Sequence, residues 1–239
     1  MPEPIQAGLW GLLAASSLVI GAVAGVVLDV PRRSVALVMG FGAGALISAL
    51  AFDLAEEAFA AGGTVVTAAG LAAGALTYFI GDTLLARRAR RRGASTQTGG
   101  PGLVLGALLD GIPESIVLGA TLLGGAGVSA SLLAAVFVSN VPESIAGARD
   151  LSDEGHPRRS VIGLWLVVAV ASGLAAGIGN AVLVDADPGV VGAVQAFAGG
   201  AILTMLADTM MPEAFENGGN AVGLATVFGF AVAFLLARA

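Results

Sequence analysis

The chain has 239 residues, a formal net charge of −6 and a mean hydropathy of +0.91, and only 12% of its residues are charged while 56% are hydrophobic. A soluble core of this size does not need that hydrophobicity, so we expect long apolar runs to cross a membrane. The absence of cysteine excludes disulfides and thiol chemistry, and the one histidine, His156, falls in a polar loop.

Apolar segments of about 20 residues each predict an all-α membrane protein with eight transmembrane helices. We place these helices, to within a few residues, at 6–28, 34–60, 64–86, 101–123, 127–149, 160–183, 190–216 and 220–237. The whole chain, 1–239, is expected to form a single transmembrane domain. An arginine-rich polar loop at 87–100 separates the first three segments from the last five.

The distribution of arginines along the chain predicts the orientation of these segments in the membrane. Nearly all arginines lie in or beside the loops that follow segments one, three and five, and Arg238 is the exception. Cytoplasmic loops carry such an excess of basic residues, so we expect this face in the cytoplasm and both chain ends outside the cell (inner or plasma) membrane. Because the loop at 87–100 adjoins the membrane, we interpret it as a topology signal and a lipid contact rather than a nucleic-acid site.

Two parts of the chain resemble each other. Residues 41–48 match residues 197–204, and the same offset aligns Glu57 with Glu213 and the pair Gly62-Gly63 with Gly218-Gly219. Five segments separate the copies, so the copies are expected to cross in opposite directions. Inverted repeats that flank a midplane site are typical of transporters. The predicted organisation is repeat one at 6–86, a central pair of helices at 101–149 and repeat two at 160–237.

Each helix of the central pair carries a proline followed by a glutamate. Asp110 and Glu114 are four residues apart around Pro113, and Asn140 and Glu143 are three apart around Pro142, so each pair shares one helix face. Each proline also frees a backbone carbonyl one turn earlier. A carboxylate in a membrane segment is costly and marks a functional site by default. The predicted metal ligands, suited to a divalent cation, are Asp110, Glu114, Glu143 and Asn140.

Further acids in the segments predict a cation pathway, since no arginine lies in the interior of any segment to neutralise them. The predicted topology puts some of them toward the outside and others toward the cytoplasm. Ser139 either lines the path or bonds a neighbouring helix. The pathway candidates are Asp53 and Glu57 on the outer side, Ser139 at the centre, and Asp82, Asp208 and Glu213 on the inner side.

At the two proline-glutamate motifs the chain resembles the ZIP (Zrt-/Irt-like protein) family of divalent-metal transporters, as a divergent bacterial member. The resemblance implies eight helices in an inverted three-plus-two-plus-three arrangement and a metal site on helices four and five. Pro113, Glu114 and Glu143 match the family motifs. Asp110 stands where the family usually has histidine, which favours harder ions such as Mn²⁺. Ala176 stands near the place of a glutamate that often completes a second metal site.

The expected function is transport of a divalent cation, into the cytoplasm as the family does, with no enzymatic activity and no cofactor. The cation is a substrate: Zn²⁺ first, with Mn²⁺, Fe²⁺ and Cd²⁺ as other candidates. Alternatives are a proton-coupled exporter, a carrier of another cation, a metal sensor or scaffold, and an intramembrane metal-dependent hydrolase. The hydrolase is disfavoured because the segments hold no His or Cys ligand. The expected partners are divalent metal ions and the lipid bilayer, and no nucleic acid is expected. A homodimer is one possible oligomeric state.

Overall fold

The computed structural model of the chain describes residues 1–91, 100–123 and 127–238, and side chains within these ranges except at 88–91 and 100–104. The described residues form helices, with no strand among them. In chain order the elements are α1 (Glu3–Val27), α2 (Arg32–Ala49), the π-helical η1 (Leu50–Leu54), α3 (Ala55–Arg91), α4 (Gly100–Ala120), α5 (Ala130–Asp153), α6 (Arg158–Leu183), α7 (Pro188–Met205), the π-helical η2 (Leu206–Met210), α8 (Met211–Gly218) and α9 (Ala221–Leu236).

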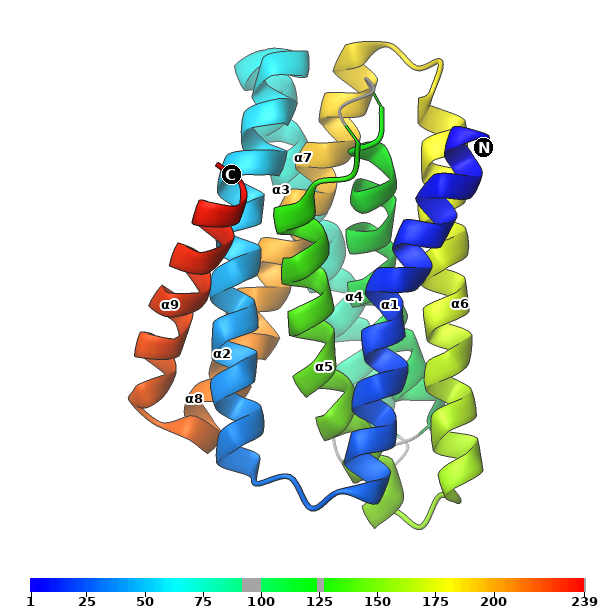
Figure 1. Cartoon of the computed structure of the whole chain (residues 1–239), viewed down its shortest axis with the longest axis vertical. Helices are drawn as coiled ribbons and strands as arrows, with labels where there is room; N and C mark the ends of the chain where they lie inside the picture. The colour runs from blue at the N-terminus through cyan, green and yellow to red at the C-terminus, as the bar shows by residue number, and fades with distance from the viewer. Residues whose placement is uncertain (92–99, 124–126, 239) are drawn as a thin grey trace.

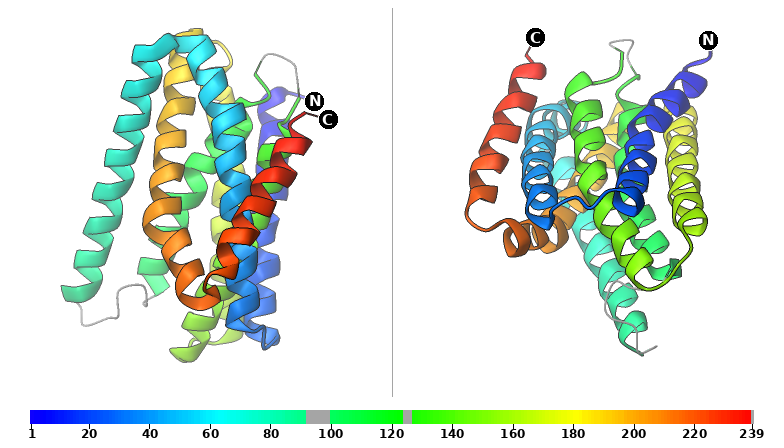
Figure 2. Two further views of the ribbon diagram at one scale, coloured as in Figure 1. Left: turned by 90° about the vertical axis from the view of Figure 1, so that its left-hand side faces the viewer. Right: turned by 60° about the horizontal axis from the view of Figure 1, so that its bottom comes forward.

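Among the described residues, five helical stretches are long and apolar enough to cross a membrane, which confirms the prediction of an all-α membrane protein. They are Glu3–Val27, Arg32–Arg87, Ala130–Asp153, Arg158–Leu183 and Pro188–Gly218. The second stretch is not one straight rod, because Gly63 within α3 has a φ of 70°. The chain turns back there, as Figure 2 shows at the upper end of α3. A residue with a side chain rarely adopts that φ.

Local sequence explains where several helices begin. Proline occupies the first turn or the position before it in α1, α6 and α7, where its missing N–H is not needed. The hydroxyl of Ser129 accepts a hydrogen bond from Leu132 N and so caps α5. Pro113 and Pro142 instead lie inside α4 and α5, and both helices continue through them.

The helices pack in two groups. In one, α1 lies against α5 and α6, and α4 lies against α6. In the other, α3 lies against α7 and α2 lies against α9, as both views in Figures 1 and 2 show. Contacts of α2 with α5 and of α4 with α7 join the two groups. We call them the α1/α4/α5/α6 group and the α2/α3/α7/α9 group.

Glycine permits the closest crossings in the α2/α3/α7/α9 group. A methyl group on Gly44 of α2 would collide with the Thr226 carbonyl of α9, and one on Gly74 of α3 would collide with the Phe197 carbonyl of α7. Small residues at such crossings let helix backbones approach directly in a membrane protein.

Irregular backbone occurs at matching places in the two similar parts of the chain. The π-helical segments begin at Leu50 and Leu206, an offset of 156 residues. The same offset separates Gly63 from Gly219, whose φ values are 70° and 65°. Local π-helical turns are often found at functional sites.

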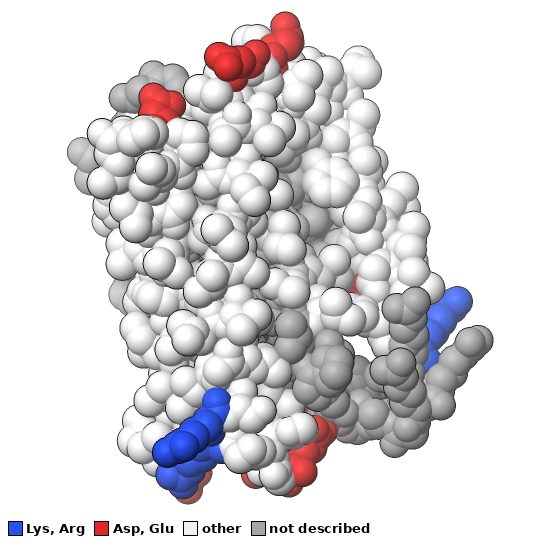
Figure 3. Space-filling view, turned by 90° about the vertical axis from the view of Figure 1, so that its right-hand side faces the viewer, with Lys and Arg blue, Asp and Glu red and all other residues white. Residues whose placement is uncertain are grey.

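Charges collect at the two ends of the molecule. On the face in Figure 3, Asp and Glu side chains lie at both ends, Arg side chains lie only toward the lower end, and the middle band is almost entirely uncharged. Arg32 and Arg33 begin α2, Arg149 lies near the end of α5, and these helix ends are at the lower end in Figure 1, away from both chain termini. In the arginine-rich loop, residues 92–99 lie outside the described residues.

Candidate functional site

The α4 part of the site is a buried carboxylate next to a half-buried one. Glu114 is only 2% exposed, and its Oε2 atom has no hydrogen-bond partner in the described structure. Asp110 lies one turn earlier on the same face and accepts a hydrogen bond at 2.7 Å from the Tyr78 hydroxyl of α3. Burying a carboxylate without partners is costly, so Glu114 is poised to accept a proton or a cation.

The α5 part of the site lies on the next helix along the chain. Asn140 is buried and Glu143 is half-buried. The Ser144 hydroxyl donates to the Asn140 carbonyl at 2.7 Å and to the Val141 carbonyl at 3.1 Å, so a side chain satisfies backbone oxygens near Pro142. The Ser139 hydroxyl donates to Val136 O at 3.0 Å, so its hydrogen serves its own helix and not a neighbouring one.

The three central carboxylates act on one another electrostatically. Glu143 experiences the charges of Asp110, Glu114 and also Glu213, and Glu114 experiences that of Asp110. Yet no three His, Cys, Asp or Glu side chains among the described residues converge as a ready-made metal site. The structure therefore brings Asp110, Glu114 and Glu143 into one neighbourhood without closing them around one point.

The two outer acids of the predicted path are held by hydrogen bonds. Asp53, on η1, accepts from the Ser129 hydroxyl at 2.8 Å and also from the Ser131 hydroxyl. Glu57, at the start of α3, accepts from Gln195 Nε2 of α7 at 2.7 Å. Like charge acts between Asp53 and Glu57 as well.

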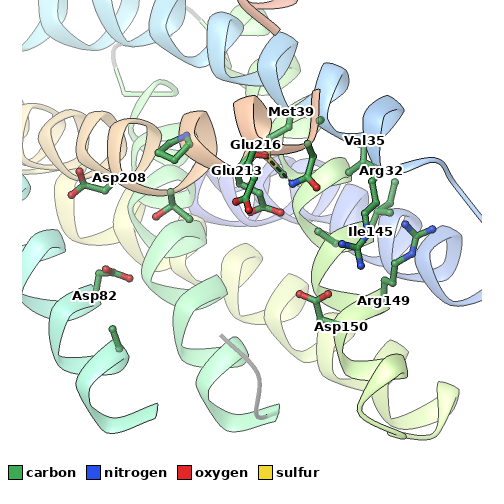
Figure 4. A pocket seen from close by; sticks show the side chains of 16 residues that line it. Arg32, Val35, Met39, Asp82, Ile145, Arg149, Asp150, Asp208, Glu213 and Glu216 are labelled. Carbon is green, nitrogen blue, oxygen red and sulfur yellow. Dashed lines mark hydrogen bonds between the residues drawn. The ribbon is translucent and has the colours of Figure 1, made fainter. Parts of the chain in front are cut away.

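The three inner acids of the predicted path, Asp82, Asp208 and Glu213, line one cleft. The cleft has a volume of about 540 Å³ and lies between α2, the end of α3, the end of α5 and η2 with α8. Figure 4 shows Asp82 and Asp208 from facing elements on one side of it and Glu213 near its middle, with Arg32 and Arg149 at the far side. Because Glu213 also acts on Glu143, acidic charge extends from the cleft to the central carboxylates.

Several polar residues of the site escaped prediction from the sequence. Tyr78, Ser129, Ser131 and Gln195 each donate to a predicted acid. Tyr78 carried the clearest signal, since it is the only tyrosine of the chain and falls within a predicted membrane segment. Its partner could not be read from spacing, because Asp110 lies on another helix.

No protein-family model matches the sequence, and no curated protein matches it either. Function therefore rests on the residues and their geometry.

Proposed function

We propose that this protein transports divalent cations through a carboxylate site on α4 and α5. Asp110, Glu114 and Glu143 supply hard oxygen ligands, and Asn140 supplies an amide oxygen beside them. The cation crosses as substrate, and the protein performs no covalent chemistry on it.

The observation that carries this proposal is Glu114. It is a glutamate at 2% exposure with an unpartnered oxygen, and two further carboxylates act electrostatically in its neighbourhood. Like charges in a low-dielectric interior repel strongly unless a cation or protons neutralise them. A purely structural role does not explain three such groups together, whereas cation binding compensates all three.

The arrangement of the other acids supports movement of the ion through the site. The cleft with Asp82, Asp208 and Glu213 opens near the arginine-bearing ends of the helices. Toward the other end, Asp53 and Glu57 are tied by hydrogen bonds. We infer a protein open toward the cytoplasm, with both termini outside, that carries the ion inward by alternating access.

We further infer eight membrane crossings with an inverted repeat. The matching π-helical segments, the matching glycines at 63 and 219, and the paired packing of α2 with α9 and of α3 with α7 support this organisation. Together with the two proline-glutamate motifs, it favours a divergent relative of the ZIP family. Zn²⁺ is the first expected ion, with Mn²⁺ next because Asp110 replaces a nitrogen ligand by oxygen.

Uptake by proteoliposomes tests the function. Purified protein is reconstituted and offered Zn²⁺, Mn²⁺, Fe²⁺ and Cd²⁺ separately, with protein-free vesicles and the Glu114→Gln variant as controls. We expect saturable uptake of at least one ion by the wild type and background uptake by the variant. A second series with an imposed proton gradient separates an importer from a proton-coupled exporter. Equal fluxes in wild type and Glu114→Gln for every ion would refute the proposal.

A further inference from the structure

Tyr78 is a buried polar residue next to the central carboxylates and is not one of the proposed cation ligands. It lies on α3 and is 4% exposed, and its hydroxyl donates to Asp110 Oδ1 of α4 at 2.7 Å. The two residues belong to different groups of helices, so this bond joins the α2/α3/α7/α9 group to the α1/α4/α5/α6 group.

Tyr78 also lies beside the cleft. Thr209 of η2 and Asp82 of α3 both influence the electrostatics of the same hydroxyl. Thr209 and Asp82 both line the cleft. The phenol therefore lies near both Asp110 and residues of the cleft lining.

The phenol constrains how Asp110 can bind a cation. A tyrosine hydroxyl has a single hydrogen, and here that hydrogen is committed to Oδ1, which leaves Oδ2 as the freer oxygen. Calcium takes six to eight oxygen ligands and often uses both oxygens of a carboxylate, whereas zinc takes about four ligands. A carboxylate limited to one oxygen therefore disfavours the larger ion.

We propose that Tyr78 is a positioning residue that presents Asp110 to the cation through one oxygen and thereby selects small transition-metal ions over Ca²⁺. This inference rests on the proposed function and adds a determinant of its ion specificity.

Competition in proteoliposomes tests the selection. Uptake of Mn²⁺ is measured against rising Ca²⁺ in the wild type and in Tyr78→Phe, which keeps the ring and removes the hydroxyl. Loss of a hydrogen bond to a carboxylate corresponds to about a tenfold change, so we expect Ca²⁺ to compete about tenfold more effectively in the variant. The matched control is Ser17→Ala, which removes a buried hydroxyl that bonds only within α1. The same competition curve for Tyr78→Phe and wild type would overturn the inference.

A second measurement needs no substitution. Because Tyr78 is the only tyrosine, growth with 3-fluorotyrosine places one fluorine label beside Asp110. We expect its ¹⁹F resonance to shift saturably with Zn²⁺ in otherwise wild-type protein and to stay unmoved over the same range in Glu114→Gln. An unmoved resonance in protein that does take up Zn²⁺ would overturn the role of Tyr78 but leave transport intact. Absence of uptake for every divalent cation would instead overturn the proposed function, and this inference with it.

Discussion

Asp53 accepts a hydrogen bond from Ser129 at 2.8 Å, and this contact joins the two groups of helices at the end away from the cleft. The Ser129 hydroxyl also caps α5 by accepting from Leu132 N, so the contact is tied to the start of a helix rather than to a free loop. Ser131 donates to the same carboxylate oxygen. Partly buried hydrogen bonds of this kind hold the two groups of helices together at this end and so favour the conformation in which the cleft is open at the other end.

The two ends differ in one further pair of residues. Under the proposed repeat, Glu57 corresponds to Glu213, and Gln195 corresponds to Met39, each by the offset of 156 residues. Gln195 donates to Glu57. Met39 cannot donate a hydrogen bond, and it lines the cleft together with Glu213. The end with the methionine holds the cleft, and the end with the glutamine holds the hydrogen bond between Gln195 and Glu57.

Glu114 and Glu143 should both be indispensable for transport. They share the task of holding one cation where water is scarce, so replacing either by alanine removes a charge that nothing nearby replaces. We expect Glu114→Ala and Glu143→Ala to lose uptake while remaining folded and monodisperse in detergent, and Glu57→Ala to reduce it less. Uptake measured beside thermal unfolding separates the two effects, and normal transport by Glu114→Ala would exclude the site.

Hydropathy and residue spacing predict most of the helical architecture, because a bilayer demands long apolar helices and proline and carboxylate stand out within them. Asp82, Asp208 and Glu213 line one cleft together with Arg32 and Arg149, whereas their orientation across a membrane stays a prediction. The contacts of Tyr78 with Asp110 and of Gln195 with Glu57 could not be predicted. These contacts depend on which helices pack together and at what height along their axes. The spacing of residues within a single helix does not determine either.

Asp110 should set the preference among metals. It contributes oxygen at a position where nitrogen would favour zinc, so Asp110→His is expected to shift competition toward Zn²⁺ and away from Mn²⁺. The measurement is uptake of one metal against a graded excess of the other in the same vesicles, with Asp110→Asn as the control for loss of charge. An unchanged competition profile would mean that Asp110 does not touch the ion.

Single cysteines should reveal the orientation, because the native chain has none. We expect a cysteine at Ala186, between α6 and α7, to react with an impermeant thiol reagent in intact cells. A cysteine at Ser95, which lies outside the described residues, should react only after the membrane is opened. Labelling of Ser95 from outside would reverse the topology, and with it the assignment of outer and inner acids.

Substitutions at Met39 and Gln195 should shift the equilibrium between the conformation with the cleft open and the conformation with the cleft closed. Met39→Gln places a donor beside Glu213 in the cleft and should favour closing of that end, whereas Met39→Leu adds no donor and serves as the control. A hydrogen bond to a carboxylate is worth roughly 1.5–3 kcal/mol, which is about tenfold or more in the equilibrium between the two states. Gln195→Met should have the complementary effect of loosening the end at Glu57.

Two reporter cysteines measure this shift. Ala146 lines the cleft, and Val128 is half-buried next to Ser129 at the other end. In Met39→Gln we expect a cysteine at Ala146 to react more slowly and one at Val128 to react faster than in the control. Added metal should change the reactivity at Val128 in the otherwise native background, since an ion that binds one state better biases the equilibrium toward it. If both cysteines respond to Met39→Leu as they do to Met39→Gln, the added donor is not the cause. If neither cysteine changes its reactivity when metal is added, the hydrogen bonds of Asp53 and Glu57 stabilise a region that does not change conformation during transport.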